Sequence, residues 1–110
     1  MIRQIIRIDG NVQWKVTRTS NDNWVAACDP LRITLQSETW AELMEDMALS
    51  IDAIFKEMLK SNELDKFLRD HGWTATSPIP IPSRMRNVRF DVPFLPAVVA
   101  ENAFQKQLYQ

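Results

Sequence analysis

The stretch NWVAACDPLRITLQSETWAELMEDMALSI, residues 23–51, decides the fold, because the spacing of its apolar residues changes from that of a strand to that of a helix. Trp24–Cys28 is a compact apolar run, which is typical of an inner strand. Pro30 ends this strand, since proline has no N–H to donate to a neighbouring strand. Ile33 and Leu35 then alternate with polar residues, which predicts a further strand with one buried face.

The second half of the stretch begins a long amphipathic helix. Thr39 and Glu42 form a capping box, in which the threonine hydroxyl accepts from the Glu42 N–H and the carboxylate reaches back. Apolar residues then recur at spacings of three and four, as they do on one face of a helix. These residues are Trp40, Leu43, Met44, Met47, Ile51, Ile54, Phe55 and Met58. We therefore expect a helix over residues 39–60 whose apolar face packs on a sheet.

Extended segments also precede this stretch. Gln4–Ile8 is rich in isoleucine, and a turn follows at Gly10. Val12, Trp14 and Val16 then alternate with polar residues, which is the period of a strand with one buried face. Because the connections between the strands are short, we expect an antiparallel sheet of three or four strands.

The residues after the long helix predict a shorter helix and a linker. Gly72 ends the second helix, because glycine readily adopts the left-handed conformation found after helices. Pro78, Pro80 and Pro82 stand at every second position and favour an extended linker over residues 74–87.

A last strand is expected over residues 88–92, where apolar and charged residues alternate. Pro93 and Pro96 place its continuation at a sheet edge or in an arm. The predicted fold class is α+β: an antiparallel sheet of three or four strands, a long helix on one face, a short second helix and a C-terminal strand or arm. The expected division is a domain at 1–73, the linker at 74–87, and a strand or arm at 88–110 that belongs to the same domain or to a contact between subunits.

The composition argues against several classes of function. A net charge of −1 provides no overall field to hold nucleic acid or an anionic membrane. Cys28 is the only cysteine and His71 the only histidine, and no nucleophile or orienting acid accompanies either in a known motif. We therefore expect no catalytic, cofactor-binding or metal-binding residues, and no enzyme. The chain shows no membrane span and no signal peptide, so we expect a cytoplasmic protein.

The segment W-V-A-A-C-D-P-L followed by the helix start Thr39, Trp40, Ala41, Glu42 and Leu43 resembles the HicB-like antitoxin family. The resemblance covers roughly residues 10–60. It implies a partial RNase H-like fold without the catalytic acids. The function it implies is that of an antitoxin, which neutralises a small, basic, RNA-cleaving toxin by direct contact.

Candidate partner-binding residues gather around the long helix. Glu38, Glu42, Glu45 and Asp46 lie at its start, where an acidic surface would attract a basic partner. Trp73 follows the end of the second helix, and we expect it to be partly exposed and to anchor a contact.

Two alternatives to a toxin-binding module, or a solitary relative of one, stay open. Arg84, Arg86 and Arg89 cluster around the last strand and could contact the phosphates of a nucleic acid. The chain could instead be a homo-oligomeric scaffold without a toxin, because its proline-containing arm at residues 88–98 suggests packing on a second subunit.

Overall fold

The protein has an α+β fold, as expected. The computed structural model describes residues 4–79 and 88–99, and in these it forms one sheet of three strands, one of four, a long helix and a short one. The chain divides into two compact units. Unit 1 comprises Met1–Asn11 with Ala48–Pro93, and unit 2 comprises Val12–Met47 with Phe94–Gln110.

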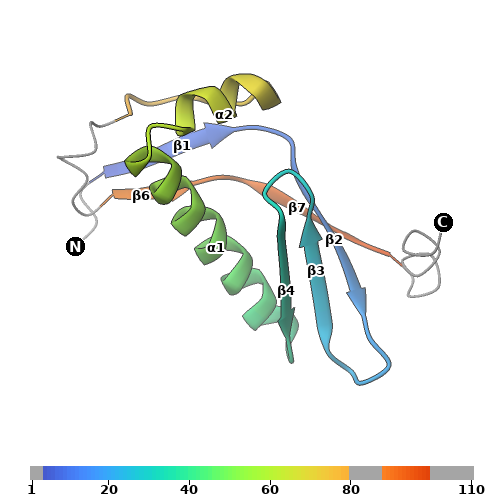
Figure 1. Cartoon of the computed structure of the whole chain (residues 1–110). Coiled ribbons are helices and arrows are strands. Elements are labelled where there is room, and N and C mark those ends of the chain that lie inside the picture. The colour runs from blue at the N-terminus through green and yellow to red at the C-terminus, as the bar shows by residue number, and fades with distance from the viewer. Residues whose placement is uncertain (1–3, 80–87, 100–110) are drawn as a thin grey trace. The chain divides into compact units, whose positions relative to one another are not determined.

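The sheet of unit 2 has the strand order β4-β3-β2-β7. Its strands are β2 (Val12–Arg18), β3 (Trp24–Cys28), β4 (Ile33–Ser37) and β7 (Phe94–Val98). The first three form the expected antiparallel meander and lie side by side in Figure 1. β7 adds to the edge of this sheet in parallel with β2, a pairing that the sequence pattern did not predict.

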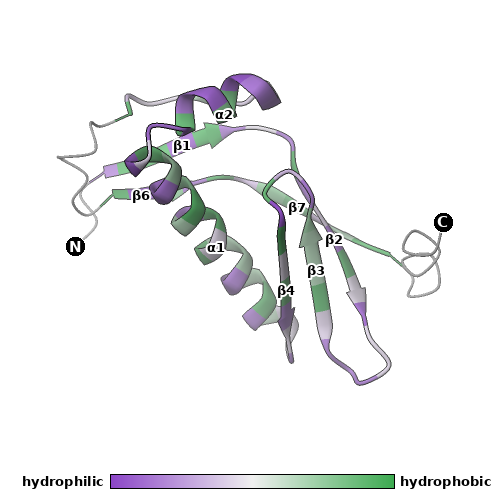
Figure 2. Cartoon of the chain, in the orientation of Figure 1, coloured by the Kyte–Doolittle hydropathy of each residue, from purple (hydrophilic) through white to green (hydrophobic). Residues whose placement is uncertain are grey.

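The buried face of this sheet follows the alternation seen in the sequence. Val12, Trp14 and Val16 on β2 are almost completely buried, and Ala26 and Cys28 on β3 are buried as well. Leu43 and Met47, in the first turns of α1 (Trp40–Lys60), have no exposed surface. Figure 2 shows how apolar and polar residues alternate along this helix. The core of unit 2 is therefore built from the residues that the period-two and period-3.6 patterns select.

Both ends of α1 are defined by local chemistry. The Glu42 N–H donates to Thr39 Oγ1 at 3.1 Å, so the threonine caps the helix as expected. At the other end, Asn62 takes a left-handed conformation with φ of 63°. The Glu63 N–H then donates to the Met58 carbonyl at 2.8 Å, which is the closing bond of a Schellman motif. The helix expected over residues 39–60 is confirmed.

The sheet of unit 1 has the order β5-β1-β6. Its strands are β1 (Gln4–Asp9), β5 (Thr74–Ala75) and β6 (Val88–Asp91). β5 pairs with β1 antiparallel, whereas β6 pairs with β1 in parallel. The short helix α2 (Leu64–His71) ends at Gly72, whose φ of 69° is left-handed, as the sequence predicted.

An aromatic cluster forms the centre of unit 1. Phe55 of α1 is fully buried and contacts three rings: Phe67 at 6.0 Å between centroids, Trp73 at 6.4 Å and Phe90 at 5.6 Å. The ring of Trp73 stacks on that of Phe55 with an interplanar angle of 13°. Such contacts between rings add to the free energy of apolar burial, so Phe55 ties α1 to α2 and β6.

The residues expected to form an arm have partners within the chain. β6 pairs with β1, and β7 pairs with β2 over the register Val12–Phe94 to Val16–Val98. The sequence left residues 88–98 either in the same domain or in a contact between subunits, and the structure pairs both strands with strands of the same chain. This pairing between distant segments satisfies the backbone groups of the segment. Of the expected linker, β5 and the residues up to Ile79 are described, and residues 80–87 lie outside the described residues.

Asp52 protects the outer edge of β6. It lies on α1, and its Oδ1 accepts a hydrogen bond from the Phe90 N–H at 2.7 Å, while its Oδ2 pairs with Lys56 Nζ at 2.7 Å. The side chain of Asp52 is only 16% exposed. Asp52 lies outside the apolar stripe of α1, and its carboxylate serves as a backbone acceptor for an edge strand.

We expect Asp52→Ala to lower the free energy of unfolding by about 1–3 kcal/mol, because it leaves the Phe90 N–H without an acceptor. Urea unfolding followed by circular dichroism measures this change. Asp70→Ala is the matched control, since Asp70 is an exposed carboxylate whose hydrogen bond from Lys66 Nζ lowers its pKa. Equal unfolding midpoints for the two variants would contradict the edge-capping role of Asp52.

Candidate protein-binding surface

Four carboxylates form a single exposed surface in unit 2, which we call the acidic patch: Glu38, Glu42, Glu45 and Asp46. Glu38 lies in the turn before α1, and the other three lie in the first two turns of the helix. Residues three and four positions apart share one side of a helix, so Glu42 stands beside both Glu45 and Asp46. All four sequence-predicted acids are therefore exposed around the start of α1.

The acidic patch is not neutralised within the described part of the chain. No described lysine or arginine forms an ion pair with any of its four members, whereas Asp9 and Asp91 both pair with Arg7. Asp46 accepts a hydrogen bond from Ser37 Oγ at 3.0 Å, which fixes this carboxylate beside the end of β4. The helix N-terminus lowers the electrostatic cost of gathering the acids. The negative charge of the patch is thus available to a partner.

The structure does not support Trp73 as a surface anchor. Trp73 is only 6% exposed and packs among Phe55, Phe67 and His71. The expectation of partial exposure is wrong, because Trp73 is the residue after the helix-ending Gly72. Its N–H closes the Schellman motif on the Leu68 carbonyl at 2.8 Å, and this motif commonly turns an apolar side chain back onto the helix. That motif was the sequence signal for its burial.

Trp40 is more exposed than the sequence predicts, whereas Trp73 is less exposed. The apolar stripe assigns Trp40 to the core, but it is 37% exposed. Its ring meets that of Trp24 edge to face at 5.0 Å between centroids. Arg18 lies over the ring of Trp24, with its guanidinium carbon 5.4 Å from the ring centroid. An accessible tryptophan therefore stands between Glu38 and Glu42 in the sequence, next to the acidic patch.

The predicted nucleic-acid contacts are only partly described. Arg89 is exposed on β6, beside Ile5 of β1, which is 58% exposed. Arg84 and Arg86 lie outside the described residues. Arg7, on the same sheet, is paired with Asp9 at 3.5 Å and with Asp91 at 3.3 Å. The described part of this surface therefore carries charges of both signs.

The single histidine and the single cysteine both have local structural roles. His71 Nδ1 donates to the Phe67 carbonyl one turn back along α2, at 2.8 Å. Cys28 is 1% exposed, and burial raises the pKa of its thiol. Less thiolate is present at neutral pH as a result, which disfavours reaction at sulfur.

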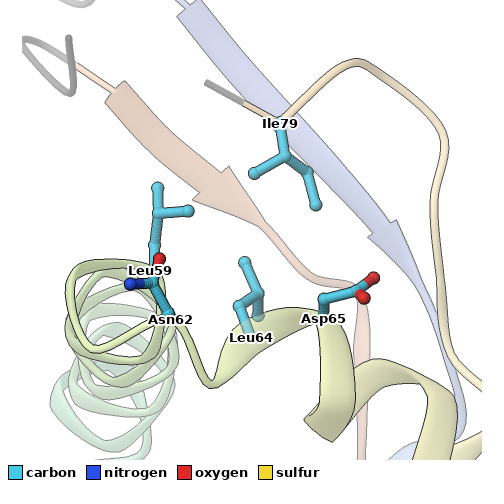
Figure 3. A pocket seen from close by; sticks show the side chains of 5 residues that line it. All are labelled: Leu59, Asn62, Leu64, Asp65 and Ile79. Carbon is cyan, nitrogen blue, oxygen red and sulfur yellow. The ribbon is translucent and has the colours of Figure 1, made fainter. Parts of the chain in front are cut away.

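A small pocket lies in unit 1. It has a volume of about 240 Å³ and is lined by Leu59, Asn62, Leu64, Asp65 and Ile79. Figure 3 shows that the helix residues line one side of it and that Ile79 lies opposite. Asp65 is the one charged group among the described residues that line it, and it pairs with Arg69 at 3.6 Å. The lining offers apolar contact with few polar groups, in a volume below that of most ligand pockets.

Two further properties of the described residues bear on function. No three histidine, cysteine or carboxylate side chains among them stand close enough to hold a metal ion. Neither described helix is both long and apolar enough to cross a membrane.

Comparison with protein-family models, curated proteins and solved structures finds no match to this chain. The resemblance to HicB-like antitoxins therefore stays a hypothesis that rests on the residues around Thr39.

Proposed function

We propose that this chain is a protein-binding module that acts by contact rather than by catalysis. The observation that carries the proposal is the acidic patch, in which four exposed carboxylates gather at one helix start with no described basic partner. A surface of this kind raises the rate at which a basic partner arrives, because opposite charges steer the encounter.

The partner class follows from the resemblance described above. In this proposal the chain is a HicB-like antitoxin or a solitary relative of one, and it covers the RNA-binding surface of a small basic toxin. An RNA-binding surface is positive because it must attract phosphates, so it is complementary to the acidic patch. The complex would form in the cytoplasm. Trp40, which is exposed beside the patch, supplies the apolar contact that charged surfaces alone lack.

Reversing the charge of the patch should weaken capture of the partner. We expect Glu42→Lys with Glu45→Lys to slow association about tenfold or more at low salt, and the further reversal of Glu38 and Asp46 to slow it again. The measurement is association kinetics, with pull-down of a small basic protein encoded beside this chain. Because these side chains are exposed, the circular dichroism spectrum should not change.

A matched control carries the same change of charge away from the patch. Glu57 and Glu63 are exposed acids of unit 1, and Glu57→Lys with Glu63→Lys should leave capture nearly unchanged. If both double variants slow association equally, net charge rather than the patch is responsible. If the purified chain cleaves RNA in a metal-dependent manner, the binding-module proposal fails.

A further inference from the structure

The edges of the two sheets differ in how they are protected. On β6, Asp52 accepts the outward Phe90 N–H. β5 is only two residues long, and β7 contains Pro96, which has no N–H to offer. β4 is the exception. It is a five-residue edge strand, Ile33–Ser37, with no proline and no charged residue.

The outer edge of β4 has unused hydrogen-bonding groups. In an antiparallel pair, every second residue directs its N–H and C=O away from its neighbour. No hydrogen bond from the rest of the described chain reaches the outward groups of Ile33–Ser37. Thr34 and Gln36 are exposed, whereas Ile33 and Leu35 are half-buried. An edge of this kind is a template for an additional strand.

The residues that flank β4 identify what the additional strand is. The segment reads Arg32-Ile-Thr-Leu-Gln-Ser-Glu38, with a positive charge before the strand and a negative charge after it. When the segment is laid antiparallel on itself and centred on Leu35, Arg32 falls opposite Glu38. Thr34 falls opposite Gln36, and Leu35 falls opposite itself. Ile33 falls opposite Ser37, and the charges at the two ends of the segment are complementary in this register.

Arg32 and Glu38 do not satisfy each other within one copy. Both side chains are exposed, and neither forms an ion pair with any residue that the structure describes. The five residues of β4 lie between them and span about 17 Å, and Arg32 stands in the turn before the strand with a left-handed φ of 55°. This separation is far beyond ion-pair distance. A second copy supplies the missing partner at both ends of the strand, with no like charges placed opposite each other.

We propose that two copies of this chain associate through β4, antiparallel about a two-fold axis at Leu35, with Arg32 of each copy opposite Glu38 of the other. The two four-stranded sheets of unit 2 then form one continuous eight-stranded sheet, built on the strand order found in each copy. A two-fold contact is the simplest way to close an edge with a self-complementary sequence. The contact goes beyond the proposed function and uses one member of the acidic patch, Glu38.

An interface centred on one strand pair is small, so we expect a weak, salt-sensitive dimer. Sedimentation velocity of the full chain over a wide range of concentration measures its dissociation constant. Arg32→Glu places Glu opposite Glu38 at both ends and should raise that constant about tenfold. Glu38→Arg should do the same, and the double variant Arg32→Glu with Glu38→Arg should restore the original value, because it exchanges the charges without losing complementarity.

Two further variants locate the contact. Thr34→Lys with Gln36→Lys changes exposed positions only and places lysine opposite lysine, so it should abolish the dimer while keeping the fold. Arg89→Glu makes the same change as Arg32→Glu at an exposed arginine of unit 1 and should have no effect on the dissociation constant. Amide exchange of residues 33–37 should slow as the concentration rises.

Three results would overturn the proposal: a monomer at all concentrations, a dimer that the single charge variants leave unchanged, or a double exchange that fails to restore association. Failure here is distinct from failure of the proposed function. Arg32 is not part of the acidic patch, so Arg32→Glu should leave capture of a basic protein intact whether or not the dimer exists.

Discussion

Replacing Met47 with aspartate is expected to lower the free energy of unfolding by more than about 4 kcal/mol. Met47 has no exposed surface and lies on α1 in the core of unit 2. The change removes the apolar burial of the methionine and places a carboxylate at a fully buried position. Because a domain of this size is stable by about 5–15 kcal/mol, a large fraction of the protein should be unfolded near body temperature. Thermal and urea unfolding followed by circular dichroism measure the effect.

Leu49→Asp is the matched control on the same helix. Leu49 is 53% exposed, so the same kind of substitution should change the free energy of unfolding by less than about 1 kcal/mol. The contrast depends only on which side of α1 is buried. A Met47→Asp protein that melts at the same temperature as the Leu49→Asp protein would show that the apolar face of α1 is assigned incorrectly.

The local elements could be predicted because their signals are local. Val12, Trp14 and Val16 are buried at every second position, and the apolar residues of α1 follow at spacings of three and four. The side-chain cap at Thr39 and the left-handed Gly72 required only the residues within one helical turn. Each of these features is determined by residues that neighbour one another in the sequence.

The sheet partners of the C-terminal strands could not be predicted in the same way. β1 pairs with β6 in the register Gln4–Val88, and β2 pairs with β7 in the register Val12–Phe94. Alternation indicates that a segment is a strand, but it carries no information about which distant strand accepts its hydrogen bonds. Prolines suggested an arm, and Pro96 does lie on an edge strand, yet the edge belongs to the same chain.

Burial of single side chains depends on the same distant contacts. Asp52 falls on the polar side of the helix pattern, but β6 brings a backbone N–H to its carboxylate. The acidic patch was easier to predict, because carboxylates spaced three and four apart at a helix start are solvated unless another element covers them. Its exposure follows from the sequence, whereas the identity of its partner depends on a second molecule.

Removing the ring of Trp73 is the second change with a large expected effect. Trp73→Ala should cost about 3–5 kcal/mol, because it leaves a cavity beside Phe55 and Phe67 in the core of unit 1. Trp73→Leu fills part of that cavity and should cost less. Urea unfolding gives both free-energy changes. Loss of the stacked tryptophan ring should also weaken the near-ultraviolet circular dichroism signal.

Gly10 provides an independent test of where that ring lies. A Cβ atom added at Gly10 would stand 2.7 Å from Cδ1 of Trp73, so Gly10→Ala should cost about 2–3 kcal/mol through steric overlap alone. In the Trp73→Leu protein the indole is absent, and Gly10→Ala should cost less than about 1 kcal/mol. The difference between the two costs is the coupling energy of a double-mutant cycle.

Gly72→Ala serves as the control for this cycle. Gly72 has a left-handed φ of 69° and no atom within 4 Å of its added Cβ, so its cost of about 1 kcal/mol arises from backbone strain. That cost should be the same with tryptophan or leucine at position 73, because no ring contact is involved. If Gly10→Ala is equally costly in both backgrounds, the indole of Trp73 does not pack over Gly10. Trp73 would then not be buried in the core of unit 1, and it would again be a candidate for the contact surface.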